Sequence, residues 1–566
     1  MPPPHRLLLN DHTVQPRFEV LKAIAYSSRS KCIAQSYSQI AAERRVLHQK
    51  TTEKLFSGKR RIRQQAAVLD RPSTSDPPEQ TDVATSSEKE QYVWTKQWYP
   101  VTLTSALNPR KPNAIQLLGK ELVLWKDEAG DWICMADKCS HRLAPLSEGR
   151  VENGNLMCAY HAWSFNSKGN LVDVPQAHHY GPDGNARACA SRRGCVATFP
   201  VKVAQEMVFV WPESGAMAAL EAANTKPVLS PYMTEQRPYK TMNGEPVYTV
   251  GKSFMRDVPL SFEHQMENLC DPAHFNPSHS EVAGDRRHEF TGMAKIEELP
   301  VEGQLQTLFG DAKGVAGKVT MLAGIGRPVH TSWHHVVMPG LFTLYTPKPK
   351  DIKGAEFELL HIHVTPTKPG HVRILVHFYV AGKNAPLPLK IFPALVPEWY
   401  SHLQGLEITD GDNTFLVTQD RVTREIEEQE GLPWYKSYYM PTNADKMLAE
   451  MRKWVDTIGG GGPFPGTKAP APIPKTEALD RLYQHTMICP SCSGALRNFR
   501  ALRVVLAIAA GAFAASSMAV AALRGLTGGL TPLWFGAAAV ACAALALVAN
   551  HFVKLLTFKV YEHHKH

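Results

Sequence analysis

Cys139-Ser-His141 is followed, after sixteen intervening residues, by Cys158-Ala-Tyr-His161, and these two Cys-His pairs decide how the chain is organised. Two thiolates and two imidazoles can hold a two-iron two-sulfur cluster, with the cysteines on one iron and the histidines on the other. A zinc site with mixed Cys and His ligands is the alternative. The unequal spacing within the two pairs disfavours zinc. We therefore expect a [2Fe-2S] cluster at Cys139, His141, Cys158 and His161.

The sequence around these pairs predicts a small antiparallel β domain over residues 92–214. Short alternating runs at 115–118, 121–125, 132–135 and 204–211 indicate strands, and Gly, Asn and Asp separate them. The loops Cys139-Ser-His-Arg-Leu-Ala-Pro145 and Cys158-Ala-Tyr-His-Ala-Trp-Ser164 resemble the cluster-binding loops of Rieske domains. The resemblance implies an all-β Rieske domain. Ala162 departs from it, because Gly commonly follows the second cluster His; the extra methyl is tolerated unless the backbone needs a positive φ.

Residues 215–458 predict a second, larger domain of mixed composition. A helix is expected over 216–224, strands over 341–345, 357–364 and 372–380, and helices over about 390–403 and 414–430. We expect an α+β chain whose catalytic domain is helix-grip-like, with an antiparallel sheet. His361 and His363 share one face of a strand, and for such a pair a packed or solvated face is favoured over a ligand set.

A second metal site is indicated by His274 and His279, which lie five residues apart with Pro277 between them. Proline breaks a regular helix, so we expect the second histidine just beyond a helix end. Two histidines and one carboxylate form the facial triad of non-haem Fe(II) oxygenases. Asp412 is the candidate carboxylate, although it could instead cap the helix that it is expected to open. Asp410 is the runner-up.

The spacing Asn268-x-x-Asp271-x-x-His274-x-x-x-x-His279 resembles the iron-site motif of Rieske non-haem iron oxygenases. The resemblance implies that His274, His279 and Asp412 bind Fe(II) and that Asn268 lies near the iron. It also implies that Asp271 bridges an iron-bound histidine to a cluster histidine of a neighbouring subunit. A head-to-tail homotrimer is therefore implied.

Further stretches, including Trp98-Tyr-Pro-Val101 and Val174-Pro-Gln-Ala177, resemble the pheophorbide a oxygenase group of plastid proteins. This group includes enzymes that act on chlorins and Rieske proteins of the inner-envelope translocon. The resemblance implies O2-dependent oxygenation of a chlorin or chlorophyll catabolite, held in a large apolar pocket that residues of the 330–380 strands would line. The alternatives are a redox-sensing subunit of the chloroplast protein-import translocon and an oxygenase of another hydrophobic substrate, such as a sterol.

The electron donor is expected to be a separate protein. The chain has no Gly-x-Gly-x-x-Gly after a strand and no P-loop, so it shows no flavin or nicotinamide site. In plastids the expected donor is ferredoxin. Nucleic acid is not expected as a partner, because the formal charge of +9 comes largely from residues 1–60, which hold eleven Lys or Arg and four Asp or Glu.

The two ends of the chain carry targeting and anchoring signals. Residues 1–66 have the basic, Ser-rich composition of a plastid transit peptide, and residues 67–91 read as a disordered linker. Residues 459–475 form a Gly/Pro linker. Residues 501–566 hold two apolar runs, 504–523 and 533–549, that predict a membrane anchor of two transmembrane helices. A buried helical hairpin of a soluble domain is the alternative.

Basic residues flank the anchor on both outer sides, which places the catalytic body on the side where membranes keep positive loops. We therefore expect a chloroplast membrane protein, of inner envelope or thylakoid, with its body in the stroma. Between linker and anchor, the segment 476–500 contains Cys489-Pro-Ser-Cys492. Such spacing lowers thiol pKa values and suits a redox pair. A family parallel suggests reduction by thioredoxin; half a zinc site is the alternative, with His485 as the only further ligand nearby.

Overall fold

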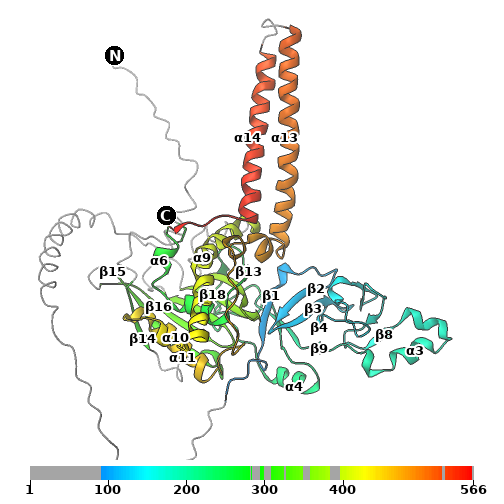
Figure 1. Ribbon diagram of the computed structural model, residues 1–566, viewed down its shortest axis with the longest axis vertical. Coiled ribbons are helices and arrows are strands. Elements are labelled where there is room, and N and C mark those ends of the chain that lie inside the picture. The colour runs from blue at the N-terminus through cyan, green and yellow to red at the C-terminus, as the bar shows by residue number, and fades with distance from the viewer. Residues whose placement is uncertain are drawn as a thin grey trace, which may run out of the picture. The chain divides into compact units, whose positions relative to one another are not determined.

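The computed structural model describes residues 91–280, 282–283, 293–298, 308–323, 327–347, 357–382, 395–524 and 530–563. The predicted transit peptide, 1–66, and all but the last residue of the predicted linker, 67–91, lie outside these ranges. The described residues form antiparallel sheets, helices and a long C-terminal helical hairpin (Figure 1). The predicted α+β class is confirmed.

The N-terminal part is built from short strands in three antiparallel sheets, ordered β1-β11-β10, β2-β3-β4-β9 and β5-β6-β7-β8. The first predicted cluster loop lies between β4 and β5, and the second lies between β6 and β7. Trp125, Leu156 and Phe165 are fully buried in the core that supports them. The strands are β1 Tyr99–Leu103, β2 Asn113–Leu117, β3 Lys120–Lys126, β4 Trp132–Ala136, β5 Arg150–Glu152, β6 Asn155–Met157, β7 Ser164–Phe165, β8 Leu171–Asp173, β9 Thr198–Phe199, β10 Val201–Ala204 and β11 Met207–Val210.

The strand predicted over 204–211 is confirmed in its later part as β11, but its beginning is wrong, because the chain turns back after β10. Gln205 and Glu206 form the turn of a hairpin, with φ of +47° and +64°. Turns of this kind need positive φ at both central positions and usually use Asn or Gly. Here the side chain of the buried Gln205 stabilises the turn, since it accepts a hydrogen bond from the Ser230 amide at 3.1 Å. A contact with a distant residue thus stabilises a turn whose sequence lacks the usual Asn or Gly.

The second part centres on an eight-stranded antiparallel sheet, ordered β12-β19-β18-β17-β16-β15-β14, with β13 also paired to β19. The strands predicted at 341–345, 357–364 and 372–380 are confirmed as β17, β18 and β19. The helix predicted over 216–224 is confirmed as α4 Ala216–Asn224. The strands are β12 Val247–Thr249, β13 Phe254–Val258, β14 Met293–Glu298, β15 Gly314–Ala323, β16 Arg327–Val337, β17 Leu341–Pro347, β18 Phe357–Lys368 and β19 His371–Ala381.

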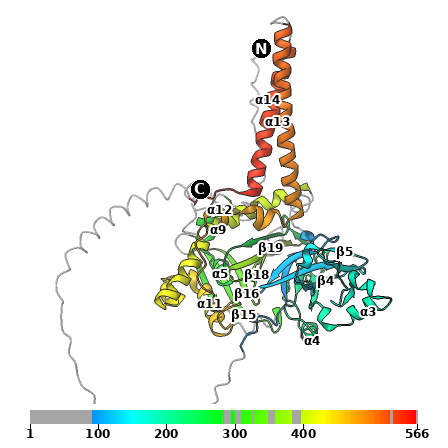
Figure 2. The same cartoon turned by 45° about the vertical axis from the view of Figure 1, so that its right-hand side comes forward.

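The two faces of this sheet bury different partners because successive side chains point to opposite sides. On one face, Phe342 and Ile374 pack in a core with residues of α5, α9 and α11 (Figure 2). On the other face, Leu359 packs with Met233 and Tyr239. The buried His361 and His363 lie on this second face, as the packed-face interpretation predicts. The three helices are α5 Phe262–Cys270, α9 Glu398–Glu430 and α11 Lys446–Thr457.

The prediction of separate helices at 390–403 and 414–430 is wrong over the described residues, since α9 is one helix of 33 residues. Two glycines and several Asp and Thr residues between 404 and 413 suggest a break, because these residues favour the helix least. In the structure the glycines allow close packing instead. A Cβ on Gly405 would lie 2.9 Å from the ring of Phe254, and one on Gly411 would lie 3.2 Å from Nδ1 of His279.

The C-terminal segment ends in an antiparallel hairpin of α13 Pro490–Arg524 and α14 Thr531–Thr557, which run side by side (Figures 1 and 2). Both helices are long and apolar enough to cross a membrane. They extend well beyond the predicted apolar runs. In particular, α13 begins at Pro490, so the predicted Cys-x-x-Cys segment is joined to the anchor rather than separate from it. Proline suits the first position of a helix because its missing N–H has no partner there.

Candidate functional site

The two predicted cluster loops have the same backbone geometry despite their different spacings. In each loop the cysteine amide donates to the carbonyl five residues later, at 2.8 Å for Cys139 and 2.9 Å for Cys158. In each, the residue four positions after the cysteine donates back to its carbonyl, at 2.9 Å and 3.0 Å. The loops are thus two tight, equivalent turns that each project one Cys and one His.

The four predicted ligands come together between these loops. Cys139 and Cys158 are buried, at 1% and 2% exposure. The rings of His141 and His161 face each other edge to face, with centroids 4.5 Å apart, and His141 also stacks on Trp163 at 4.4 Å. Two buried thiols and two solvent-facing imidazoles fit the ligand set of a Rieske [2Fe-2S] cluster.

Ala162 adopts the strained backbone that would have favoured glycine. Its φ is +60°, and Leu143, at the equivalent position of the first loop, has φ +61°. The backbone at this position therefore does need a positive φ, so the extra methyl of Ala162 is tolerated only with strain. A left-handed conformation costs a non-glycine residue roughly 1–2 kcal/mol. The two loops carry this cost in parallel.

The second predicted site is built by the chain that follows α5. Ser261 caps α5, and its hydroxyl accepts a hydrogen bond from the His264 amide. Two residues of the predicted site flank the short helix α6 Phe275–Ser278: His274 lies at its start, and His279 lies just beyond its end, as predicted. Pro277 is tolerated because it lies in the only turn of this helix.

Asp412 lies beside both histidines. Its Oδ1 atom is 3.2 Å from Nε2 of His279 and 3.9 Å from Nε2 of His274. Because Asp412 lies in the interior of α9, the alternative that it caps a helix is wrong. Oδ1 of Asp412 and Nδ1 of His279 are buried without a hydrogen-bond partner in the described part of the chain. A buried carboxylate oxygen that accepts no hydrogen bond from the described residues and faces two imidazoles fits a divalent iron.

Asp410, the runner-up, points elsewhere. Its carboxylate is fully buried and forms ion pairs with Arg256 and Arg481, each at 2.7 Å. Both oxygens are therefore occupied by guanidinium groups. The geometry brings Asp412, and not Asp410, to the two histidines.

Asp271 contacts His274 through its backbone. The Asp271 carbonyl accepts a hydrogen bond from Nδ1 of His274 at 2.6 Å, while its carboxylate oxygen lies 3.8 Å from the same atom. A carbonyl only accepts, so Nδ1 of His274 carries the proton. Nε2, which faces Asp412, is then unprotonated and has a lone pair available to a metal ion. Burial raises the pKa of the Asp271 carboxyl, and His274 opposes that shift. Asn268 is buried on α5, and its carbonyl accepts from the Asp271 amide at 3.2 Å.

No sequence pattern predicted that the C-terminal tail contacts this site. Tyr561 follows α14 and is buried, and its hydroxyl donates to the Ser278 carbonyl at 2.9 Å. The ring of His563 packs on Tyr561, with centroids 4.9 Å apart. Gly411 was also missed, although its lack of a side chain allows His279 to approach α9. These residues are distant in sequence from the motif, so no spacing pattern could identify them.

A third group of possible metal ligands forms around the Cys-x-x-Cys motif. His402, His485, Cys489 and Cys492 are all buried, and one ligand atom of each lies within 4.8 Å of the others. Sequence reasoning found the two cysteines and His485. It missed His402, which lies on α9, 83 residues before His485. Only the fold brings it to the motif.

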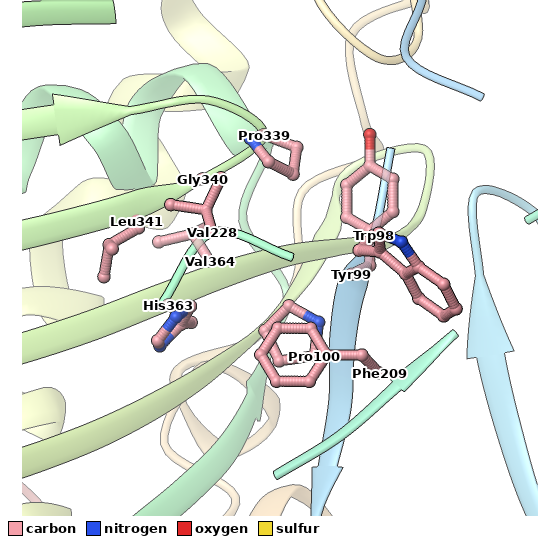
Figure 3. A pocket seen from close by; sticks show the side chains of 10 residues that line it. All are labelled: Trp98, Tyr99, Pro100, Phe209, Val228, Pro339, Gly340, Leu341, His363 and Val364. Carbon is pink, nitrogen blue, oxygen red and sulfur yellow. The ribbon is translucent and has the colours of Figure 1, made fainter. Parts of the chain in front are cut away.

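The large apolar substrate pocket expected along the 330–380 strands stays a prediction. The cavity shown in Figure 3 has a volume of about 10 Å³, which is enough for one water. It lies between Pro100 and Phe209 of the N-terminal part and Leu341 and His363 of the large sheet. None of the three groups of possible metal ligands contributes to its lining.

Comparison with protein families matches residues 97–200 to the Rieske [2Fe-2S] domain and residues 314–430 to the family described as pheophorbide a oxygenase. A chloroplastic pheophorbide a oxygenase of Oryza sativa is 31% identical over 86% of this chain and 88% of its own length. The chloroplastic flavonoid 8-hydroxylase 2 of Ocimum basilicum is 27% identical over 80% of this chain and 83% of its own length.

Protein TIC 55 of Arabidopsis thaliana is 26% identical over 82% of this chain and 84% of its own length. Among solved structures, a dicamba monooxygenase bound to dicamba aligns with 65% of this chain and 98% of its own, with a TM-score of 0.46 and 18% identity. The three sequence relatives align with 80–86% of this chain, a share large enough that both predicted metal sites fall within each alignment.

Proposed function

The chain belongs to the pheophorbide a oxygenase family of Rieske oxygenases, and from that premise we propose that it oxygenates a chlorin-type substrate, such as a chlorophyll catabolite, with O2. The observation that carries the proposal is the group formed by His274, His279 and Asp412 in a chain that also carries the four cluster ligands. A protein that only transfers or senses electrons needs no open iron site. The catalytic function is therefore favoured over redox sensing.

We assign Cys139, His141, Cys158 and His161 to a [2Fe-2S] cluster and His274, His279 and Asp412 to a mononuclear Fe(II). When bound, these groups supply single electrons and open coordination positions for O2 and substrate.

The chain's own residues prepare both sites. The Asp271 carbonyl holds His274 in the tautomer whose Nε2 is free, and Gly411 leaves room for His279 beside α9. Trp163 fixes the ring of His141 by stacking. Asn268 lies close to the second site in the same turn as Asp271 and is proposed to help shape it.

Electron transfer is proposed to run between subunits. In a head-to-tail homotrimer, the carboxylate of Asp271 would accept a hydrogen bond from a cluster histidine of the neighbouring chain, because that carboxylate is not committed to His274 and lies 3.8 Å from it. The exposed His141 and partly exposed His161 support this, since an imidazole edge at the surface can reach a partner. Ferredoxin is proposed as the external donor.

We propose a chloroplast membrane location with the catalytic body in the stroma. The chloroplastic relatives and the two long apolar helices support the membrane location. Arg497, Arg500 and Arg503 precede the apolar part of α13, and Lys554 and Lys559 follow that of α14. Positive residues on both flanks support a stromal body. Regulation by thioredoxin at Cys489 and Cys492 would require local opening, because both thiols are buried.

The experiment that tests the function measures product mass. Purified full-length protein, reduced ferredoxin and ¹⁸O2 are combined with pheophorbide a, with protochlorophyllide or with a colourless ring-opened catabolite. We expect label in one chlorin-type product. The matched control is His274→Ala, which should keep the paramagnetic signal of the reduced cluster and lose all label incorporation.

A flavone is included as a fourth substrate because of the similarity to a flavonoid 8-hydroxylase. Label in the flavone alone would reject the chlorin and keep an oxygenase of another hydrophobic substrate. No label in any product, with both metal sites shown to be full, would reject the catalytic proposal and favour the redox-sensing role.

A further inference from the structure

The buried group around Cys489-Pro-Ser-Cys492 has the spatial arrangement of a metal site that the proposed oxygenase function does not use. Nε2 of His485 lies 3.2 Å from Sγ of Cys492 and 3.2 Å from Nδ1 of His402. Nδ1 of His402 lies 3.4 Å from Sγ of Cys492 and 3.6 Å from Sγ of Cys489. Four potential ligand atoms thus surround one point.

The outer nitrogens of both histidines are already committed. Nε2 of His402 donates to the Ser253 carbonyl at 3.0 Å, and Nδ1 of His485 donates to the Met255 carbonyl at 2.5 Å. A carbonyl cannot donate, so these nitrogens carry the protons of the neutral rings. The two inner nitrogens, 3.2 Å apart, then both present lone pairs to each other. Two acceptors at that distance repel unless a proton or a cation lies between them.

We propose that His402, His485, Cys489 and Cys492 bind one structural zinc ion. With Zn–S bonds of about 2.3 Å and Zn–N bonds of about 2.0 Å, tetrahedral ligand atoms lie roughly 3.3–3.8 Å apart. The four separations given above, 3.2–3.6 Å, lie close to that range. Carbonyl oxygens bound to the outer nitrogens of ligating histidines are also the usual second layer of a zinc site.

All four ligands are buried, and the cavity that His402, His485 and Cys489 help to line has a volume of only about 10 Å³, so the site suits a structural ion rather than a catalytic one. His402, His485 and Cys492 are at most 2% exposed, and Cys489 is 6% exposed. A closed set of four protein ligands leaves no position for substrate or water. The same burial disfavours a disulfide that exchanges with a reductase, because the attacking thiol of a reductase needs access to a sulfur.

The charges at the site also suit a divalent ion. Two thiolates and one Zn²⁺ sum to zero, so the buried group carries no uncompensated charge. Cys492 lies in the first turn of α13, where the positive end of the helix dipole favours a thiolate. The described residues place one further carboxylate close by, that of Glu398, 3.8 Å from Nε2 of His402.

The zinc ion would join the membrane hairpin to the catalytic helix. His402 lies on α9, ten residues before Asp412, and Cys492 lies at the start of α13. Ser253 and Met255, whose carbonyls hold the two histidines, border or belong to β13 of the large sheet. One ion would therefore fix the anchor, the sheet and the iron-site helix to one another, and its loss would release α13 from α9.

The first test needs no mutation. Full-length protein is purified in detergent under anaerobic conditions without added zinc, and its metals are counted. We expect one zinc per chain in addition to the three irons of the two proposed iron sites. The zinc X-ray absorption spectrum should show two sulfur and two nitrogen neighbours, at about 2.3 Å and 2.0 Å.

Three outcomes would overturn the proposal. The first is a protein without zinc whose Cys489 and Cys492 react as free thiols or form a disulfide. The second is zinc bound only by oxygen and nitrogen, which indicates adventitious metal elsewhere. The third is iron in place of zinc at the two cysteines.

The second test uses variants. Cys492→Ser and His402→Ala should each lower the zinc content at least tenfold while the signal of the reduced [2Fe-2S] cluster is kept. The matched control is Cys542→Ser, which removes a cysteine of α14 outside the group and should keep one zinc. Full zinc in both site variants would reject the site. If a variant does not fold, zinc is replaced by Co²⁺ in the unmutated protein and the absorption spectrum is recorded. Thiolate-bound Co²⁺ has a charge-transfer band, and its absence would reject the site.

Discussion

Two regions of this molecule present the same donor atoms, two cysteine sulfurs and two histidine nitrogens, in opposite settings. At the cluster loops, the cysteines are buried and His141 is exposed, and all four residues lie within 23 positions of the chain. At the proposed zinc site, all four residues are buried. The donors come from α9, from the short helical segment Leu482–Thr486, and from Cys489 and Cys492 at the start of α13. Exposure of the imidazoles suits electron exchange, whereas complete burial suits a structural ion.

A ligand set alone therefore does not define a site. Short, rigid loops that hold their own ligands give a motif that can be read from the sequence. A site assembled from separate elements can have equally good geometry and give almost no sequence signal. Spacing identified the first region, and only the fold identified His402.

The largest expected effect separates the two regions directly. Cys158→Ser should abolish the paramagnetic signal of the cluster and lower turnover by at least 100-fold, because a serine hydroxyl is a poor substitute for a terminal thiolate ligand of the cluster iron. Zinc content should not change. Cys195→Ser, an exposed cysteine of the same part of the chain, is the control. Loss of zinc together with the cluster would show that the two regions are not independent.

The next effect tests the helix that the proposed zinc site shares with the iron site. Asp410 on α9 pairs with the fully buried Arg256 and Arg481. Asp410→Asn removes the only ion pair that Arg256 forms among the described residues and one of the two that Arg481 forms, the other being with Glu407 at 3.3 Å. A buried guanidinium group is thereby left without a counter-charge, so we expect a loss of about 3–5 kcal/mol of stability. Thermal unfolding followed by circular dichroism measures it. Glu430→Gln, at the exposed end of α9, should change the melting temperature little.

A further set of buried histidines differs from both regions, because it contains no cysteine. His335, His361, His363 and His377 line one face of the large sheet. Burial lowers the pKa of His335 to about 4, of His363 to about 3 and of His377 to about 4. The folded protein thus keeps these rings neutral below the pH at which the unfolded chain protonates them.

Because these pKa values are lowered in the folded protein, acid destabilises the fold. The contribution of these histidines to the free energy of unfolding is fully present above about pH 6.5. It falls as the pH decreases toward about 4, by up to about 1.4 kcal/mol per pH unit for each histidine. Urea unfolding between pH 7 and pH 4 measures the slope. His377→Phe should reduce it, and the exposed His178→Gln should not. An unchanged slope in His377→Phe would contradict the assignment.

The smallest effect concerns the backbone of the cluster loops. Ala162→Gly should raise stability by up to about 1 kcal/mol, because glycine adopts φ of +60° without the steric cost that alanine carries. The temperature at which the cluster absorbance is lost measures the gain. Ala190→Gly, where φ is −68°, should give no gain. A lower bleaching temperature for Ala162→Gly would show that the methyl contributes packing that outweighs the strain.

Much of the fold could be predicted from the sequence. The strands at β17, β18 and β19 and the helix α4 follow from alternation and helical composition over short windows, because the period of buried positions is a local property. The turn at Gln205 and the continuity of α9 could not be predicted in this way. In both, packing overrides local preference: Gln205 bonds to Ser230, and Gly405 and Gly411 meet Phe254 and His279.

Spacing along the chain was enough to propose the cluster ligands and the two iron-binding histidines, because each set lies in one short stretch whose spacing limits the chemistry. The tertiary structure decided between Asp412 and Asp410, since two residues two positions apart on a helix point in different directions and only one reaches the histidines. It alone brought His402 to Cys489 and Cys492 and Tyr561 to Ser278. Contacts between distant elements depend on how helices and sheets pack, and that packing leaves no fixed spacing in the chain.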